Sequence, residues 1–220
     1  MPGGAAAIRD PWRMAVGYLF HHFGRDFLKL PIPFVRELPH TKTEVLLRMI
    51  EAGLSTPLTS SCGRLFDAVA ALAGVREQVN YEAQAAIELE MVIGEGPQSE
   101  QAYPLGIRTQ ASGLEIDTRP LFEALLDDLA SGVSPSAISL KFHNALVEVF
   151  ARLARMVRER KGLDRVCLSG GTFQNAYLLE HLTARLEARG FQVFSHAEVP
   201  AGDGGLSLGQ ALVAAHRCTS

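Results

Sequence analysis

The chain has 220 residues, 47% of them hydrophobic and 20% charged, and a formal net charge of −3 at pH 7, which suits one large globular domain or two small lobes. This balance argues against a generally basic nucleic-acid surface, and no apolar run is long enough to span a membrane. The cysteines Cys62, Cys167 and Cys218 are odd in number and widely spaced, which argues against a disulfide framework and favours a reducing cytoplasm.

The first helix is expected to begin at Asp10, a capping residue followed by proline, and to end near His21 and His22. Neighbouring positions on a helix point about 100° apart, so the histidine pair favours partners of the helix dipole over metal ligands. A second helix is expected over 41–52, where Gly53 ends the pattern.

A third helix is predicted within 60–74, and its two faces differ. One face is apolar, whereas the other is flat except for a single carboxylate. The flat face consists of Gly63, Asp67, Ala71 and Gly74. A flat face suits a planar ligand, but tight packing on another helix with Asp67 in solvent is the interpretation that composition alone favours. A further helix is expected over 81–93.

The middle of the chain predicts a small hairpin followed by two helices. Strands are expected over 102–108 and 113–116, joined by a turn at 110–112. Helical patterning then covers 119–129 and, after a capping serine and a proline, continues from 135 to about 160. His143 borders the apolar stripe of the longer helix, where a core-edge histidine satisfied by one hydrogen bond is the expected role.

The last third of the chain predicts a strand over 165–168, a glycine turn, a helix over 173–189 and a strand over 191–194, which together make a βαβ unit. Gly170 and Gly171 allow positive φ and close approach of a ligand, while a helix start offers N–H groups to an anion. A second glycine turn, 201–205, also opens a helix, over 206–216, and carries Asp203. The two turns are candidates to face one ligand.

Four stretches resemble the C-terminal part of the HypF family, the carbamoyltransferases that mature nickel–iron hydrogenases. These are 59–70 (TSSCGRLFDAVA), 81–86 (YEAQAA), 168–175 (LSGGTFQN) and 200–210 (PAGDGGLSLGQ), and the opening segments 2–4 and 9–13 are similar too. The resemblance covers nearly the whole chain. It implies an α/β fold, the second lobe of an actin/Hsp70-like (ASKHA) domain with added helices, which TsaD-type tRNA-modifying proteins and antibiotic O-carbamoyltransferases share.

Within this TsaD-like carbamoyltransferase domain, the resemblance implies a helical lead-in over 1–60 and a nucleotide-binding lobe over 61–220. The implied activity is transfer of a carbamoyl group from carbamoyl adenylate, made from carbamoyl phosphate and ATP, to the C-terminal cysteine of a HypE-type acceptor protein. The implied nucleotide-binding residues are Asp67, at the ribose, and Ser169, Gly170, Gly171, Asn175 and Gly204. Asp203 is the implied ligand of a divalent metal at the phosphates, a role that suits a hard oxygen ligand.

Two residues depart from the family pattern. Ala83 stands where the family usually has glycine, so its methyl group would crowd a backbone contact with the nucleotide, and Thr172 replaces a valine. The resemblance also implies that the first lobe, with its metal-binding histidine cluster and phosphate loop, and the carbamoyl-adenylate-forming domain are missing. The chain is therefore expected to be incompetent alone and to need the N-terminal portion of HypF as a partner.

Two alternatives remain open. One is an O-carbamoyltransferase of the same fold that acts on a sugar hydroxyl. The other is a non-catalytic module that kept the fold and binds HypE or associates with itself through an exposed apolar face.

Overall fold

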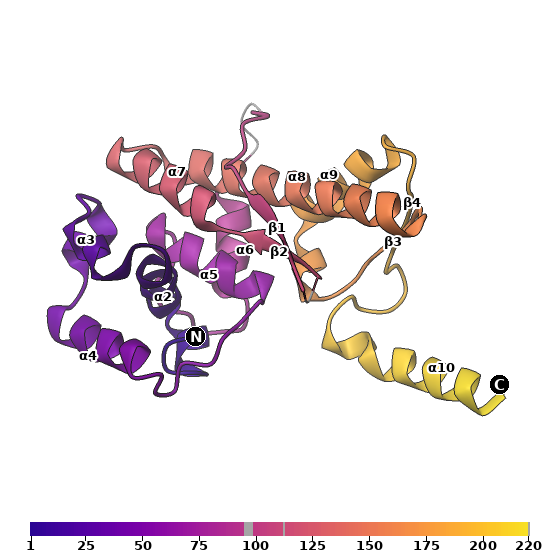
Figure 1. Cartoon of the computed structure of the whole chain (residues 1–220), viewed down its shortest axis with the longest axis horizontal. Helices are drawn as coiled ribbons and strands as arrows, with labels where there is room; N and C mark the ends of the chain where they lie inside the picture. The colour runs from indigo at the N-terminus through magenta and orange to yellow at the C-terminus, as the bar shows by residue number, and fades with distance from the viewer. Residues whose placement is uncertain (95–98, 112, 220) are drawn as a thin grey trace. The chain divides into compact units, whose positions relative to one another are not determined.

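The computed structural model describes residues 1–94, 99–111 and 113–219 (Figure 1). It divides into two compact units, Met1–Ala145 and Leu146–Ser220. This division reflects compactness alone, so the expected functional boundary between residues 60 and 61 stays a prediction. No helix in the described ranges is long and apolar enough to cross a membrane.

Helices form most of the first unit. They are α1 (Ala6–Arg9), α2 (Pro11–Phe23), α3 (Pro33–Glu37), α4 (His40–Glu51), α5 (Cys62–Leu72), α6 (Gln84–Met91), α7 (Arg119–Ala130) and the first part of α8 (Pro135–Lys161), with a 3-10 helix η1 (Gly24–Lys29). Strands β1 (Gly106–Gln110) and β2 (Gly113–Asp117) pair antiparallel, with Ile107 opposite Ile116. The hairpin and the succession of helices agree with the sequence pattern.

The core of the first unit forms around α5, because every residue from Leu65 to Leu72 is buried. This helix packs against α2 and α6, and the ring of Phe66 meets that of Phe142 from α8 edge-on, with centroids 4.9 Å apart. Packing of α5 on other helices, one of its two interpretations, is therefore confirmed. His143 is fully buried beside this contact, and its Nδ1 lies 2.8 Å from the Ser139 carbonyl oxygen, as expected for a hydrogen-bonded core histidine.

Two predicted boundaries in the first unit are wrong for local reasons. The helix expected from residue 81 begins at Gln84, because Ala83 takes a left-handed conformation with φ 61° and ψ 9°. The strand expected from residue 102 begins at Gly106, because Tyr103 forms its hydrogen bonds with helices instead of a neighbouring strand. Its N–H donates to the Lys141 carbonyl oxygen of α8 at 3.2 Å, and its hydroxyl donates to Asp128 Oδ2 at 2.7 Å. The predicted hairpin turn includes residue 112, which lies outside the described residues.

The second unit contains the predicted βαβ arrangement. Strands β3 (Arg165–Leu168) and β4 (Gln192–Ser195) pair in parallel, and α9 (Ala176–Glu187) connects them. The apolar side of α9 is buried through Leu178, Leu182 and Leu186. The predicted outward position of Arg158 on α8 is wrong: its guanidinium is half-buried, 4.0 Å from the centroid of the Phe191 ring.

The chain ends in α10 (Leu206–Thr219), which follows a short 3-10 helix, η3 (Asp203–Gly205). Every residue from Leu206 to Cys218 is exposed, including Leu212 at 64% and Val213 at 53%. The helix therefore carries large apolar side chains that nothing in the described residues covers.

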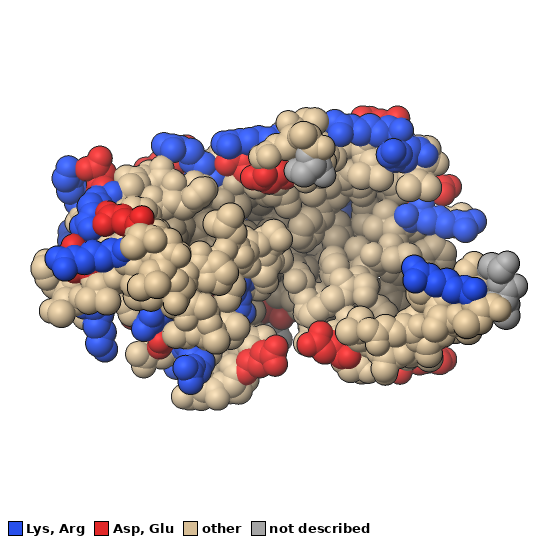
Figure 2. All heavy atoms as spheres, turned by 60° about the horizontal axis from the view of Figure 1, so that its bottom comes forward, with Lys and Arg blue, Asp and Glu red and all other residues tan. Residues whose placement is uncertain are grey.

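Charged side chains of both signs are interspersed on the face drawn in Figure 2. Several of them form exposed ion pairs, such as the guanidinium of Arg25 with Glu44 and Glu51. Exposed pairs of this kind add little stability.

Candidate functional site

The two glycine turns of the second unit lie against each other. The Gly170 N–H donates to the Ala201 carbonyl oxygen at 2.8 Å. A methyl group at Gly202 would lie 3.4 Å from Gln174 Nε2 and 3.9 Å from Gly171 Cα, so the backbones of the two turns are close neighbours. The two turns are therefore neighbours, and that they face one ligand stays a prediction.

The first turn differs in detail from the predicted anion site. Gly170 has φ +103°, as expected, but Gly171 does not have a positive φ. Gly171 instead opens a 3-10 helix, η2 (Gly171–Gln174), which separates the turn from α9. The N-terminus of α9 is capped by Asn175, whose Oδ1 accepts the Leu178 N–H at 2.8 Å. The α-helix expected from residue 173 therefore begins later, at Ala176, and is capped, so the helix start beside the glycines is that of η2.

The donors that this turn offers to a ligand follow from these contacts. The Gly170 N–H is already used to hold the second turn. The N–H groups of Gly171 and Thr172, at the start of η2, donate to no described group. A phosphate oxygen approaching this turn would therefore meet these two donors.

The second turn presents Asp203, an exposed residue at the start of η3. A methyl group at Gly205 would overlap the Pro200 carbonyl oxygen and lie 2.8 Å from Val199 Cγ1, whereas one at Gly204 would meet Pro200 Cγ at an ordinary 3.5 Å. Gly205, which sequence reasoning did not single out, is thus the glycine that the loop requires.

His196 is a further polar residue at this site that sequence reasoning missed. Its Nε2 lies 2.8 Å from Ser169 Oγ. The register pairs Leu168 with Ser195, so Ser169 and His196 directly follow neighbouring parallel strands. The carboxyl ends of parallel strands meet at one edge of a sheet, where ligands commonly bind. The predicted βαβ unit therefore already held the signal that places His196 beside Ser169.

Asp67 belongs to the first unit, on α5, and it is buried rather than solvated. It is 3% exposed, and its Oδ2 lies 2.8 Å from Arg64 Nη1. Burial raises the pKa of the Asp67 carboxyl to about 6, while the nearby Arg64 charge acts in the opposite direction. The expectation that packing of α5 would leave Asp67 in solvent is wrong.

The surroundings of Asp67 include Tyr18 of α2. Burial raises the pKa of the Tyr18 hydroxyl to about 12, with smaller contributions from the charges of Cys62 and Asp67. The Tyr18 ring stacks on Phe122 of α7, with centroids 4.9 Å apart. At neutral pH this hydroxyl is therefore protonated and adds no charge beside Asp67.

His22, at the end of α2, has a different environment from the predicted one. His22 Nε2 lies 3.0 Å from Thr118 Oγ1, and burial followed by the charge of His21 lowers the His22 pKa to about 4. A neutral imidazole does not complement a helix dipole. The cation at this helix end is Arg119, whose Nη1 donates to the His22 carbonyl oxygen at 2.9 Å.

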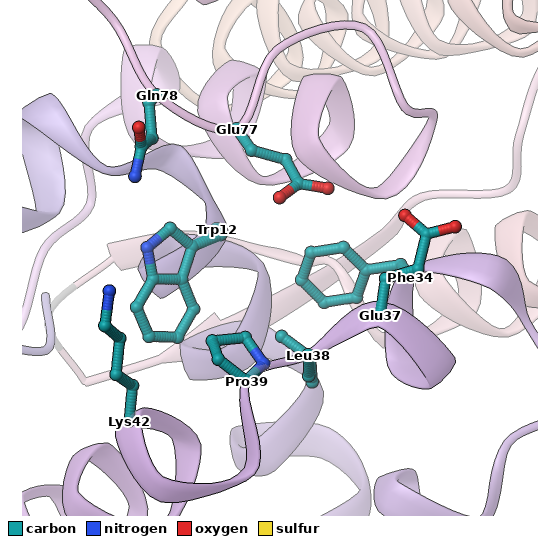
Figure 3. Close-up of a pocket in the computed structure, with 8 residues that line it drawn as sticks. All are labelled: Trp12, Phe34, Glu37, Leu38, Pro39, Lys42, Glu77 and Gln78. Atoms are coloured by element: carbon teal, nitrogen blue, oxygen red, sulfur yellow. The ribbon is translucent and has the colours of Figure 1, made fainter.

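The described residues contain no group of three or more His, Cys, Asp or Glu side chains able to hold a metal ion. Asp203 therefore belongs to no set of three protein ligands within this part of the chain. A separate shallow cleft of about 90 Å³ lies in the first unit (Figure 3). Trp12 and Phe34 are its buried aromatic residues, and Glu37 and Glu77 lie at one end. The cleft includes none of the predicted site residues.

Comparison with known proteins places these features among carbamoyltransferases. Residues 1–210 match the family model described as carbamoyltransferase, Kae1-like domain, second subdomain. The carbamoyltransferase HypF of Synechocystis sp. is 35% identical over 96% of this chain and 28% of the relative. The HypF homolog of Cupriavidus necator is 36% identical over the whole chain and 56% of the relative.

Two solved structures have the same fold. Full-length HypF in its phosphate- and nucleotide-bound form has a TM-score of 0.89 at 40% identity, and it matches 97% of this chain and 27% of that one. HypF of T. kodakarensis has a TM-score of 0.83 at 28% identity, over 97% of this chain and 28% of that one. The chain thus spans between about a quarter and just over half of the length of these relatives.

Proposed function

The chain belongs to the HypF family of carbamoyltransferases, and from that premise we propose that it forms one wall of the nucleotide site in a HypF-type carbamoyl transfer reaction. One observation carries the proposal: the hydrogen bond from Gly170 to Ala201 brings the glycine turn after β3 against the turn that holds Asp203. The contact of Ser169 with His196 at the same strand ends supports it. A solved relative in a nucleotide-bound form also supports the proposal.

The proposed ligand is ATP or carbamoyl adenylate, and each residue's role follows from its chemistry. The N–H groups of Gly171 and Thr172 would donate to phosphate oxygens. Asp67 would accept from a ribose hydroxyl, because an ionised carboxylate is an acceptor only. Asn175 has its Oδ1 committed to capping α9, so it would hold this turn in place at the nucleotide.

A divalent metal fits this chain only in part. Asp203 offers a hard carboxylate oxygen, the ligand type that Mg²⁺ prefers at phosphates. Because the described residues hold no three-ligand group, the other protein ligands would have to come from outside them. When bound, the metal would neutralise phosphate charge. This chain's own contribution is one carboxylate at the turn.

In the assembled enzyme, we propose that the C-terminal cysteine of a HypE-type acceptor takes the carbamoyl group from carbamoyl adenylate in the cytoplasm. A C–S bond forms, the carbamoyl–phosphate C–O bond breaks with release of AMP, and the thiol proton passes to solvent. The chain's share of the work is to bind and orient the nucleotide, and none of its residues is assigned to bond making. Its partners would be the rest of a HypF polypeptide and the acceptor protein. The chain spans 28% of the Synechocystis relative, which is consistent with a partial site.

A titration of the 220-residue chain with ATP and Mg²⁺ tests the proposal. We expect weak binding, seen as chemical-shift changes at the two glycine turns, and no ATP cleavage dependent on carbamoyl phosphate. Gly202→Val should weaken the binding: a Cβ at Gly202 already lies at contact distance from Gln174 and Gly171, so the two methyl groups beyond it would press the turns apart. Gly209→Ala is the matched control, since a methyl group there meets nothing within 4 Å.

Two results would overturn the proposal or part of it. The absence of any nucleotide effect on the folded chain would refute the site. Micromolar affinity together with carbamoyl-phosphate-dependent ATP cleavage would show that the chain is a complete enzyme and would refute the partial site.

One observation favours a second role, as an interaction module. The exposed leucines and valine of α10 form an apolar surface on a helix that the described residues leave uncovered. The occupant we propose is the remainder of a HypF polypeptide. Strictly monomeric behaviour at high concentration and no association with that remainder would argue against this role.

A further inference from the structure

The cleft of the first unit is built from segments that lie far apart in the sequence (Figure 3). Its aromatic floor consists of Trp12 of α2 and Phe34 of α3, which are 7% and 5% exposed. Glu37 ends α3, and Glu77 lies in the segment between α5 and α6. The Trp12 N–H donates to the Glu77 carbonyl oxygen at 3.3 Å. This backbone contact holds the Glu77 side of the cleft on the start of α2.

Two carboxylates lie at the Phe34 end of the cleft without a counter-ion (Figure 3). The side chains of Glu37 and Glu77 form no ion pair or hydrogen bond with any described residue. Partial removal from water, followed by the negative charge of Glu37, raises the pKa of the Glu77 carboxyl above its ordinary value. The two charges are therefore close enough to repel each other, and a cation between them would remove that repulsion.

The cations beside Trp12 do not fill this role. Figure 3 shows Lys42 on the opposite side of the indole ring from the two carboxylates. The guanidinium of Arg13 lies 5.4 Å from the centroid of the Trp12 ring, but its Nε is paired with Asp10 Oδ2 at 3.1 Å. The negative end of the cleft is thus left without a cation from the described residues.

The combination of aromatic rings and two carboxylates restricts the ligand. A cation is attracted by the carboxylates and by the faces of aromatic rings. A cleft of about 90 Å³ holds several water molecules, so it has room for a guanidinium group. A guanidinium is planar, stacks on aromatic rings and donates to carboxylates through a fork of N–H groups, whereas an ammonium is a strongly hydrated point charge. Among protein side chains, this chemistry selects arginine.

We propose that this cleft binds the side chain of an arginine presented by a partner protein, with the guanidinium between Glu37 and Glu77 and against the aromatic floor. The carboxylates would accept its N–H groups, and Trp12 and Phe34 would contact its flat face. None of the predicted nucleotide or metal residues lines the cleft. The inference therefore goes beyond the proposed function and does not depend on it.

Titration of the full chain with N-acetyl-L-arginine methylamide tests the proposal, because this probe carries the charge of the side chain and no other. Trp12 is the single tryptophan of the chain, so its fluorescence reports on the cleft. We expect weak, saturable binding. The citrulline counterpart has the same shape without the charge and should bind about fivefold or more weakly, the contribution of one strong exposed ion pair. The lysine counterpart should also bind more weakly than the arginine probe.

Substitutions in the cleft test which groups hold the cation. Glu37→Gln and Glu77→Gln should each weaken the arginine probe by about fivefold and leave the citrulline probe unaffected. Both side chains are exposed and the exchange preserves their size, so both variants should fold. Lys42→Met should bind the arginine probe at least as tightly as the wild type, because it removes a like charge from the lining. Glu180→Gln is the matched control: it removes the same charge from an exposed position on α9, outside the cleft, and should change nothing.

The contrary outcomes are equally distinct. Equal binding of the arginine and citrulline probes, or undiminished arginine binding in the two folded glutamine variants, would overturn the site. The absence of any fluorescence or chemical-shift response to the arginine probe would do the same. Self-association of the chain that these variants abolish would make the occupant a second copy and overturn the proposed partner. Failure of nucleotide binding would leave this inference standing, because the two sites share no residue.

Discussion

Replacing Ala83 with glycine should stabilise the protein. Ala83 has φ 61° and ψ 9°, the left-handed region, immediately before α6. That conformation costs an L-residue about 1–2 kcal/mol, while the greater freedom of glycine in the unfolded chain takes back about 0.5–1 kcal/mol. The expected net gain in the free energy of unfolding is about 0.5–1 kcal/mol.

The turn should keep its conformation in the variant, because the side chain of Gln84 bridges the residues on its two sides. The Asn80 N–H donates to Gln84 Oε1, and Gln84 Nε2 donates to Glu88 Oε1, both at 2.8 Å. Urea unfolding followed by circular dichroism measures the change. Ala86→Gly inside α6 is the control and should destabilise by about 1 kcal/mol. A lower unfolding midpoint for Ala83→Gly than for wild type would refute the left-handed assignment.

Three further predictions concern the site. Asp203→Asn should abolish carbamoyl transfer in an assay reconstituted with the rest of a HypF protein and leave the melting temperature unchanged; full turnover would remove the metal assignment. The folded-state pKa of Asp67 is raised from 3.8 to about 6, so its protonated form favours folding, and stability should fall by up to about 3 kcal/mol as pH rises from about 4 to about 6. Denaturant titrations at a series of pH values across this range should show that the free energy of unfolding changes less with pH in Asp67→Asn than in the wild type. An equal change in the two proteins would contradict the raised pKa of Asp67. Gly205→Ala should destabilise the second unit by about 1–3 kcal/mol through overlap with Pro200, while Gly204→Ala should be nearly neutral; equal melting temperatures for the two variants would disprove the crowding.

Local patterns predicted the type and order of most elements. Proline at the first position and an apolar stripe place the starts of α2 and α8 within a residue of those observed, because these signals act within a few residues of the chain. The two strands of the βαβ unit are likewise placed within a residue, whereas α9 begins three residues later than expected because η2 intervenes. The family resemblance came from such stretches, and the comparisons confirm it.

Tertiary packing decided which groups those elements bring together. The pattern of α5 identified a flat face with one carboxylate, and the spacing of three residues along the helix sets Arg64 beside Asp67. Only the packing of neighbouring helices buried that carboxylate. Likewise, the pairing of β3 with β4 decided that His196 meets Ser169. Periodicity shows which side of a helix or strand is apolar. Contacts between residues far apart in sequence depend on which other element covers that side, and no local stretch of sequence specifies that element.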